Sequence, residues 1–263
     1  MSSLGYRKYK KKILINRILV IFSQIFILVF VLSLWQWLGN KDIINTFISS
    51  SPKKVIDTIV GLYNSNNLFN HIFITIYETV ISFLLGTLIG TLIAIILWWY
   101  RFLYKVFDPY LTILNSLPKV ALGPIIIIIC GANIKSIILM ALLISVIITI
   151  INVYNSFDNV DTMKINLLKS FKASKWQILK YVILPSSYST IISSLKINVS
   201  MSLIGVIMGE FLVSKEGIGY LIMYGSQVFN LNLVISGIII LMIVSYVMYL
   251  GVNMLEKILI KNK

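Results

Sequence analysis

The chain has 263 residues, of which 58% are hydrophobic and 12% are charged, and its mean hydropathy is +0.93. Soluble domains are about 45–50% apolar and about 25% charged, so this composition excludes an ordinary soluble enzyme and a disordered chain. The formal net charge is +14. We therefore expect an all-α fold, a polytopic membrane helix bundle with about six transmembrane helices.

Six stretches of the chain are long enough to span a bilayer. A spanning helix needs about 20 apolar residues, because the hydrocarbon core is about 30 Å thick. A basic N-terminus, 1–17, precedes a single predicted transmembrane domain, 18–263. The predicted spans are 18–40, 79–100 with a helix start near Ile72, 109–134, 136–157, 181–209 and 234–255.

Two regions are less regular than a simple span. The third span contains Pro118, Lys119, Gly123 and Pro124, so we expect a broken helix with its kink at the prolines. Residues 217–233 precede the sixth span and include several polar side chains. They predict a short helix and a loop at the membrane face.

The basic residues predict the orientation. Sixteen Lys and Arg flank one side of the spans, in 1–17, 101–105, 164–180 and 257–263, against five on the other side. Loops rich in Lys and Arg stay in the cytoplasm. We therefore expect a multi-pass protein of the cell membrane, with both termini cytoplasmic and residues 40–70 outside. The basic residues lie beside spans, which argues against a nucleic-acid partner.

Motifs for catalysis, cofactors and metals are absent from the sequence. It has no Gly-Lys dipeptide and hence no P-loop, no nucleophile elbow and no dinucleotide fingerprint. Cys130 has no second cysteine to pair with, and His71 cannot build a metal site alone. We expect no cofactor, no metal and no enzymatic activity in this chain.

Two glycine pairs predict close helix contacts. Gly86 and Gly90 lie in the second span, and Gly205 and Gly209 lie in the fifth. Small residues spaced by four let helix backbones approach closely in a membrane. Contacts within the bundle and a dimer interface are both open interpretations.

The connection between the fourth and fifth spans carries an apolar face. Leu168, Phe171, Trp176, Leu179 and Val182 recur at helical spacing, and lysines occupy the other faces. This pattern predicts two short amphipathic helices joined near residues 172–175. One interpretation is a basic surface that contacts anionic membrane lipid. The other is a docking surface on which a protein partner buries the Phe and Trp side chains.

Four segments together resemble the permeases of binding-protein-dependent ABC importers. The connection ends in Val182-Ile183-Leu184-Pro185, which resembles the I-x-LP ending of that family's EAA-type cytoplasmic loop. Three further segments resemble its sequence elsewhere: SSPKKVID (50–57), FDPYLTILNSLPKVALGPIIII (107–128) and GEFLVSKEGIGYLI (209–222). They are most similar to the branch that takes nitrate, sulfonates and taurine, and also thiamine precursors and riboflavin.

The loop departs from the family pattern. Asn166 stands where the family has an acidic residue, Leu167 and Leu168 replace two alanines, and Lys172 replaces the glycine of the turn. Glycine at such a turn usually supplies a positive φ. Lysine must therefore either strain the turn or shift it.

The resemblance implies an ABC-importer permease fold and a set of partners. Two permeases, as a homodimer, would form the translocation path, and two ATP-binding subunits would dock on the loop 158–185. An external solute-binding protein would deliver the solute to 40–70 and 210–230. The residues implied in ATPase coupling are Asn166, Leu167, Leu168, Phe171, Lys172, Ala173, Trp176 and Pro185.

Charged and proline residues within the spans are candidates for the translocation path. They are Glu78, Pro118, Lys119, Pro124, Lys196 and Glu210. The four charges are scattered over three predicted spans, which argues against a membrane-embedded enzyme or assembly factor. An ion-coupled secondary transporter is the other alternative. The two lysines either face an anionic solute or pair with Glu78 or Glu210.

Overall fold

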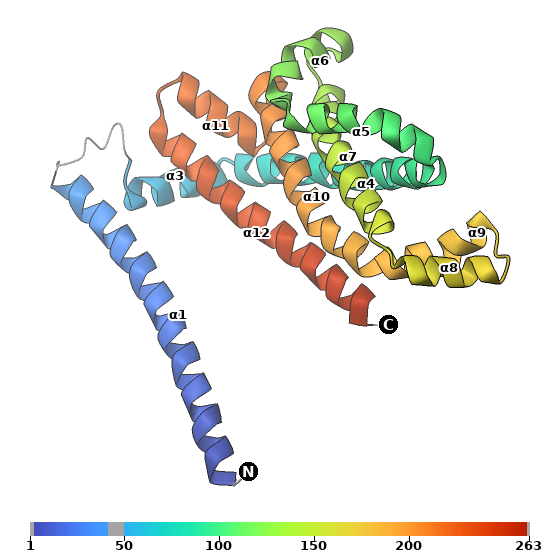
Figure 1. Ribbon diagram of the computed structural model, residues 1–263. Coiled ribbons are helices and arrows are strands. Elements are labelled where there is room, and N and C mark those ends of the chain that lie inside the picture. The colour runs from blue at the N-terminus through green and yellow to red at the C-terminus, as the bar shows by residue number, and fades with distance from the viewer. Residues whose placement is uncertain (1–2, 42–49, 262–263) are drawn as a thin grey trace.

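The computed structural model describes residues 3–41 and 50–261, and this described part contains helices and no strand (Figure 1). Residues 1–2 of the predicted N-terminal segment 1–17 lie outside it. The elements in chain order are α1 (Ser3–Asn40), α3 (Pro52–Asn64), α4 (Asn67–Trp99), α5 (Arg101–Ser116), the 3₁₀ turn η1 (Lys119–Leu122), α6 (Gly123–Cys130), α7 (Ile134–Asp158), α8 (Thr162–Ser170), α9 (Lys175–Ile178), the π turn η2 (Leu179–Ile183), α10 (Leu184–Val213), α11 (Ile218–Gln227) and α12 (Leu231–Lys261).

The predicted membrane bundle is confirmed. In the described residues, five helices are long and apolar enough to span a membrane, and a bent pair, α5 with η1 and α6, is a sixth candidate. The second of these spans begins at Asn67, which is earlier than the expected start near Ile72. The predicted span 181–209 belongs to one longer helical run, Lys175–Val213, which includes α9, η2 and α10.

Helix α7 packs against both α4 and α10, so closely that glycines occupy the points of contact. A Cβ added to Gly86 or Gly90 of α4 would overlap Ser145 or Thr149 of α7, at 2.2 and 2.5 Å. A Cβ added to either glycine of α10, Gly205 or Gly209, would likewise overlap atoms of α7. Both glycine pairs therefore serve contacts within the bundle, where van der Waals packing of backbones replaces the hydrophobic drive.

The direction of these contacts orients the three helices. Residue numbers rise together along α4 and α7, whereas Gly205 and Gly209 of α10 meet Ala141 and Ile137 of α7 in reverse order. Helix α10 therefore runs antiparallel to α4 and α7. The end of α10 consequently lies near the starts of α4 and α7.

The predicted break in the third span is confirmed. Helix α5 and the run Lys119–Cys130 meet at an angle of 93°. Leu117 has the extended backbone that a following proline favours, with ψ 138°, and Pro118 lacks an N–H to continue the helix. Pro124 then occupies the first turn of α6, where a missing N–H costs nothing.

Helix α1 stands apart from the bundle (Figure 1). Its most apolar window is 0% buried. Close to its end, the Gln36 side chain accepts a hydrogen bond from the N–H of Lys53 at 3.0 Å, which ties α1 to α3. Apolar side chains on every face are typical of a helix that lipid or a second chain surrounds.

Substitution of Gly205 by alanine should loosen the bundle. The new Cβ would lie 2.4 Å from the Cα of Ala141, so α7 and α10 must move apart. Overpacking of this kind costs about 1–3 kcal/mol. Thermal unfolding of the purified protein should show a lower midpoint for Gly205→Ala. The matched control is Gly251→Ala in α12, where no atom lies within 4 Å of the added Cβ. Equal midpoints for both variants would contradict the backbone contact.

Candidate functional site

The segment between α7 and α10 forms α8 and α9 at one end of the bundle, which we call the α8 end (Figure 1). Asp161 begins α8, and its Oδ1 accepts a hydrogen bond from the N–H of Met163 at 2.8 Å. A carboxylate here satisfies a free N–H and suits the positive end of the helix dipole. The two predicted short helices are therefore confirmed, with their junction at residues 171–174.

Lys172 strains the turn between α8 and α9 and does not shift it. Its φ is +58°, in the left-handed region. The N–H of Lys172 donates to the carbonyl of Lys169 at 2.9 Å, and the N–H of Ala173 donates to that of Leu168 at 3.0 Å. These two bonds form a Schellman motif, which usually has glycine in the left-handed position. A side chain in that conformation costs about 1–2 kcal/mol.

Helix α9 rests on the end of α4. Ser174 begins α9 with a capping box, which satisfies two N–H groups reciprocally. Lys175 donates to the carbonyl of Trp99, and the Trp176 ring packs against the Trp99 ring with centroids 6.4 Å apart. The helical run then continues through the π turn into α10, with Pro185 as the second residue of α10.

The inner face of this segment is anchored in the bundle. Ile178, Leu179 and Ile183 join Phe157 and Val160 in a buried apolar cluster. A side chain of this kind contributes about 1.5–3 kcal/mol when it is removed from water. The anchor fixes the position of α9 relative to α7 and α10.

The outer face exposes apolar side chains, which we call the outer stripe: Met163 (78% exposed), Leu167 (59%), Phe171 (73%) and Trp176 (59%). The first three are spaced by four residues and so follow one side of α8. All but Met163 were among the predicted coupling residues, and the same spacing of four could have identified Met163. Leu168, which was expected beside Phe171, instead packs inward against the buried cluster.

A polar cavity of about 610 Å³ lies between α8 and the ends of α4 and α7. Asn166 and Ala173 of the predicted coupling set line it, together with Arg101, Asp158 and Lys175. Arg101 and Asp158 form an exposed ion pair at 3.8 Å. The α8 end thus presents an apolar stripe beside a charged hollow.

Side chains of α4 and α10 hold the first turn of α11 at the opposite end of the bundle, which we call the α11 end. The Thr75 hydroxyl donates to Glu210 Oε1 at 2.6 Å and accepts from the N–H of Ile218 at 2.8 Å. Glu210 Oε2 accepts from the N–H of Gly219 at 2.5 Å. A helix start has free N–H groups and a positive dipole end, so these two side chains act as its cap.

His71 completes this arrangement. Its Nδ1 accepts a hydrogen bond from the N–H of Gly217 at 2.9 Å, and its ring stacks on Tyr220 with centroids 6.0 Å apart. Because Nδ1 accepts, the ring is neutral and carries its proton on Nε2. We call the side chains of His71, Thr75 and Glu210 the α11 clasp.

The clasp requires glycine in the α11 backbone. Gly217 has φ +100°, and a Cβ there would lie 2.3 Å from Glu210 Oε1. A Cβ on Gly219 would lie 2.7 Å from Oε2 of the same carboxylate. Thr75 and His71 were not predicted as partners of this segment. Two glycines shortly after a buried acid are a signal that a carboxylate approaches the backbone.

Glu78 and Glu210 lie together, although their charges were expected to be scattered. Their carboxyl groups are within hydrogen-bonding reach, and the side chains are 0% and 1% exposed. The two glutamates meet because α4 and α10 are antiparallel, which brings an early residue of α4 beside a late residue of α10. Spacing along the sequence does not reveal such a pairing.

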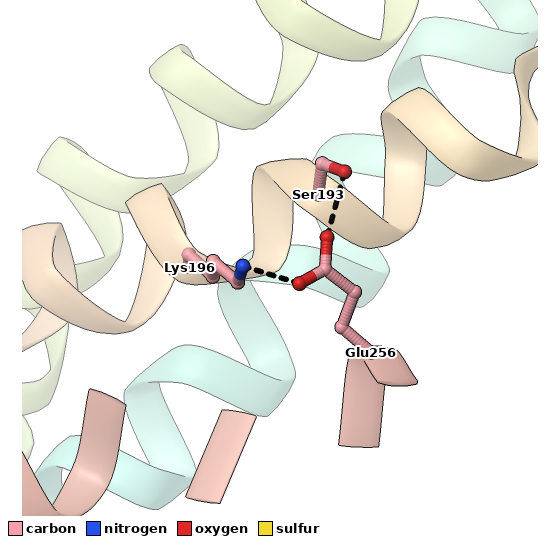
Figure 2. A network of polar contacts seen from close by, with 3 residues as sticks. All are labelled: Ser193, Lys196 and Glu256. Atoms are coloured by element: carbon pink, nitrogen blue, oxygen red, sulfur yellow. Dashed lines mark hydrogen bonds and ion pairs between the residues drawn. The ribbon is translucent and has the colours of Figure 1, made fainter. Parts of the chain in front are cut away.

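The two intramembrane lysines do not pair with these acids. Lys196 contacts Glu256 of α12, and Ser193 donates to Glu256 Oε1 at 2.9 Å (Figure 2). Lys119, in the broken span, donates to the carbonyl of Asn115 at 2.6 Å. Of the two alternatives for these lysines, pairing with Glu78 or Glu210 therefore does not occur. For Lys196, the reason is that α12 presents a carboxylate to α10 nearer the α8 end.

The chain matches the family model described as binding-protein-dependent transport system inner membrane component over residues 86–261. It is 27% identical over 224 residues to a probable ABC transporter permease protein of Haemophilus influenzae, covering 85% of this chain and 91% of that protein. It is 28% identical over 231 residues to a putative aliphatic sulfonates transport permease protein of Bacillus subtilis, covering 88% and 84%.

The fold also occurs in a solved structure, the inward facing MetNI methionine ABC transporter. The TM-score is 0.65 with 17% sequence identity, and the match covers 73% of this chain and 96% of that one. At this identity the likeness shows the fold alone.

Removal of the Thr75 hydroxyl should weaken the α11 clasp. Thr75→Val keeps the shape but leaves the N–H of Ile218 without its acceptor and Glu210 Oε1 without its O–H donor. A buried polar group left unpaired costs about 1–3 kcal/mol. Thermal unfolding should show the loss, and amide exchange at Ile218 should become faster. Thr79→Val is the matched control, because the Thr79 hydroxyl donates only to a carbonyl of its own helix. A larger effect for the control would contradict the clasp.

Proposed function

Because the chain belongs to the family of binding-protein-dependent transport system inner membrane components, we propose that it is the permease subunit of an ATP-driven importer of a small solute. The observation that carries the proposal is the outer stripe, which is exposed to solvent although its helices are anchored in the bundle. Contiguous exposed apolar side chains on a rigid support are typical of a protein docking site. The family favours this function over an ion-coupled transporter or a membrane-embedded enzyme.

We assign the outer stripe and the polar cavity beside it to contact with an ATP-binding subunit. Phe171 and Trp176 are the exposed aromatic side chains of the outer stripe, and aromatic residues dominate the energetics of docked interfaces. Helices α9 and α10 form one continuous helical run, so a displacement of α9 by the ATP-binding subunit also displaces the spanning helix α10. ATP hydrolysis then belongs to the partner, and the permease itself needs no cofactor.

We place the translocation path at the broken span, between two copies of this chain. Apolar side chains of α5 and α6 such as Ile113 and Ile128 are exposed, and Lys119 lies among them. A lysine at membrane depth costs about 2.5–3.5 kcal/mol unless it faces protein or water. A second copy of the chain, opposite the break between α5 and α6, would give Lys119 both protein and a water-filled path to face. Glu78 and Glu210 hold the α11 wall of this path, and Lys196 braces α10 against α12.

The orientation and the solute follow from the same proposal. The α8 end, which carries the basic loops, faces the cytoplasm, and the α11 end receives a solute-binding protein. Lys119 favours an anionic solute, as the aliphatic sulfonates in the name of the Bacillus subtilis relative are. Nitrate, taurine, thiamine precursors and riboflavin are the other classes that the family branch includes.

Charge on the outer stripe should release the ATP-binding subunit. Phe171→Asp or Trp176→Asp places a carboxylate where the partner buries an aromatic ring, so the complex should dissociate while the permease stays in the membrane. The measurement is affinity purification from the native membrane, with mass spectrometry for a co-purified subunit that contains a P-loop. The matched control is Phe229→Asp, an equally exposed phenylalanine (74%) at the α11 end. An intact complex in both loop variants would contradict the docking site.

Thiol labelling should place the two ends on opposite sides of the membrane. In a Cys130→Ser background, a membrane-impermeant reagent added to whole cells should label a cysteine at Asn64 but not one at Lys105. Both positions are exposed, in α3 and α5, and neither belongs to the outer stripe, so access depends on the side of the membrane. Permeabilised cells serve as the control, in which both positions should react. Labelling of Lys105→Cys alone in intact cells would reverse the orientation.

A further inference from the structure

The carboxyl groups of Glu78 and Glu210 share one site in the interior of the bundle. Glu78 comes from α4 and Glu210 from the last turn of α10, and neither side chain is more than 1% exposed. No N–H or O–H group of the described residues reaches either oxygen of Glu78. Glu210, by contrast, accepts from Thr75 and Gly219. Among the described residues, the polar partner within reach of Glu78 is therefore the carboxyl group of Glu210.

No cation of the described residues compensates this pair. On α4, His71 has a neutral ring because its Nδ1 accepts from Gly217, and Tyr77, which precedes Glu78 in the chain, is exposed. Helix α11 contributes Tyr220, which stacks on His71, and the preceding loop contributes Lys215 and Glu216, both exposed.

Among the other packed elements of the described chain, Lys135 of α7 is exposed and Lys119 of η1 donates to the carbonyl of Asn115, so neither compensates the pair. Helix α7 presents Ile137 and Ala141 to this part of α10. From α12, the described contact at the α11 end comes from apolar residues such as Ile240 and Val244, which pack on Leu68 and Ile218. Two ionised carboxylates in contact, without a cation and without solvent, would repel strongly.

We propose that Glu78 binds one proton and donates it as an O–H hydrogen bond to Glu210, so that the two side chains form a buried one-proton site beneath α11. Glu210 is the partner that stays a carboxylate, because an O–H, an N–H and the positive end of a helix dipole all converge on it. Glu78 has no such donors and therefore carries the proton. The site does not depend on the proposed transport function.

The proton links α4 to the start of α11. With it, the hydrogen bond from Glu78 adds to those that Glu210 accepts from Thr75 and Gly219, and it leaves a single negative charge at the start of the helix. Without it, a second negative charge would face Glu210, and α4 would repel the residue that holds α11. Binding of the proton therefore favours the arrangement in which α11 lies against α4 and α10.

Infrared spectroscopy of the full chain in lipid nanodiscs tests the site. At neutral pH, the wild-type protein should show a C=O band of a protonated carboxyl group that shifts in D2O and with ¹³C-carboxyl glutamate. The chain has nine acidic side chains, so a single protonated glutamate is detectable. Glu78→Gln, which keeps the shape and an N–H donor, should remove the band. Glu256→Gln is the matched control, because Lys196 already compensates that carboxylate, and its band should equal that of the wild type.

Three results would overturn the proposal. One is the absence of any protonated glutamate band from the wild-type protein, a result that needs no variant to fold. Another is a band that persists in Glu78→Gln. The last is a wild-type protein without the band whose thermal midpoint rises on addition of Na⁺, K⁺ or Ca²⁺, with the rise lost in Glu78→Gln. In that case the pair holds a metal cation in place of a proton.

Discussion

The close approach of α7 to two neighbouring helices is the contact on which the rest of the structure depends. Gly86 and Gly90 of α4 admit hydroxyl side chains of α7, and Gly205 and Gly209 of α10 admit its backbone. In lipid there is little hydrophobic drive to hold helices together, so backbone proximity and interhelical polar contacts must supply the stability. A wider spacing would separate Glu210 from α4 and would also open the cluster under α9.

Helix α10 joins the α8 end to the α11 end. It continues from α9 at the α8 end, and its last turn carries Glu210 at the α11 end. The π turn at Leu179–Ile183 lies between the exposed loop and the span, and such turns often occur at functional positions. A movement of the loop therefore displaces the helix that holds α11. One continuous helical run therefore connects Trp176 of the outer stripe to Glu210 of the clasp.

Local patterns in the sequence predicted the elements, and long-range pairings were beyond them. Run length and charge identified the spans, the prolines identified the break, and the small-residue spacing identified the glycine contacts. The junction of Glu78 with Glu210 and of Lys196 with Glu256 depends on the relative rotation of helices, which hydropathy does not encode. Met163 and Thr75 were missed for different reasons: one follows a visible spacing of four, whereas the other is an ordinary threonine until α11 is placed beside it.

The turn at Lys172 shows that the loop keeps a shape that its sequence no longer favours. The Schellman bonds to Leu168 and Lys169 are both present, so the backbone follows the course that a glycine would allow. A strain of about 1–2 kcal/mol persists only where surrounding contacts fix the conformation. Here the capped start of α8 and the buried anchor of α9 fix both sides of the turn. The departures from the family pattern therefore alter the surface chemistry that a partner meets, through Asn166 and Lys172, while the relative position of the two helices is held by the bundle beneath them.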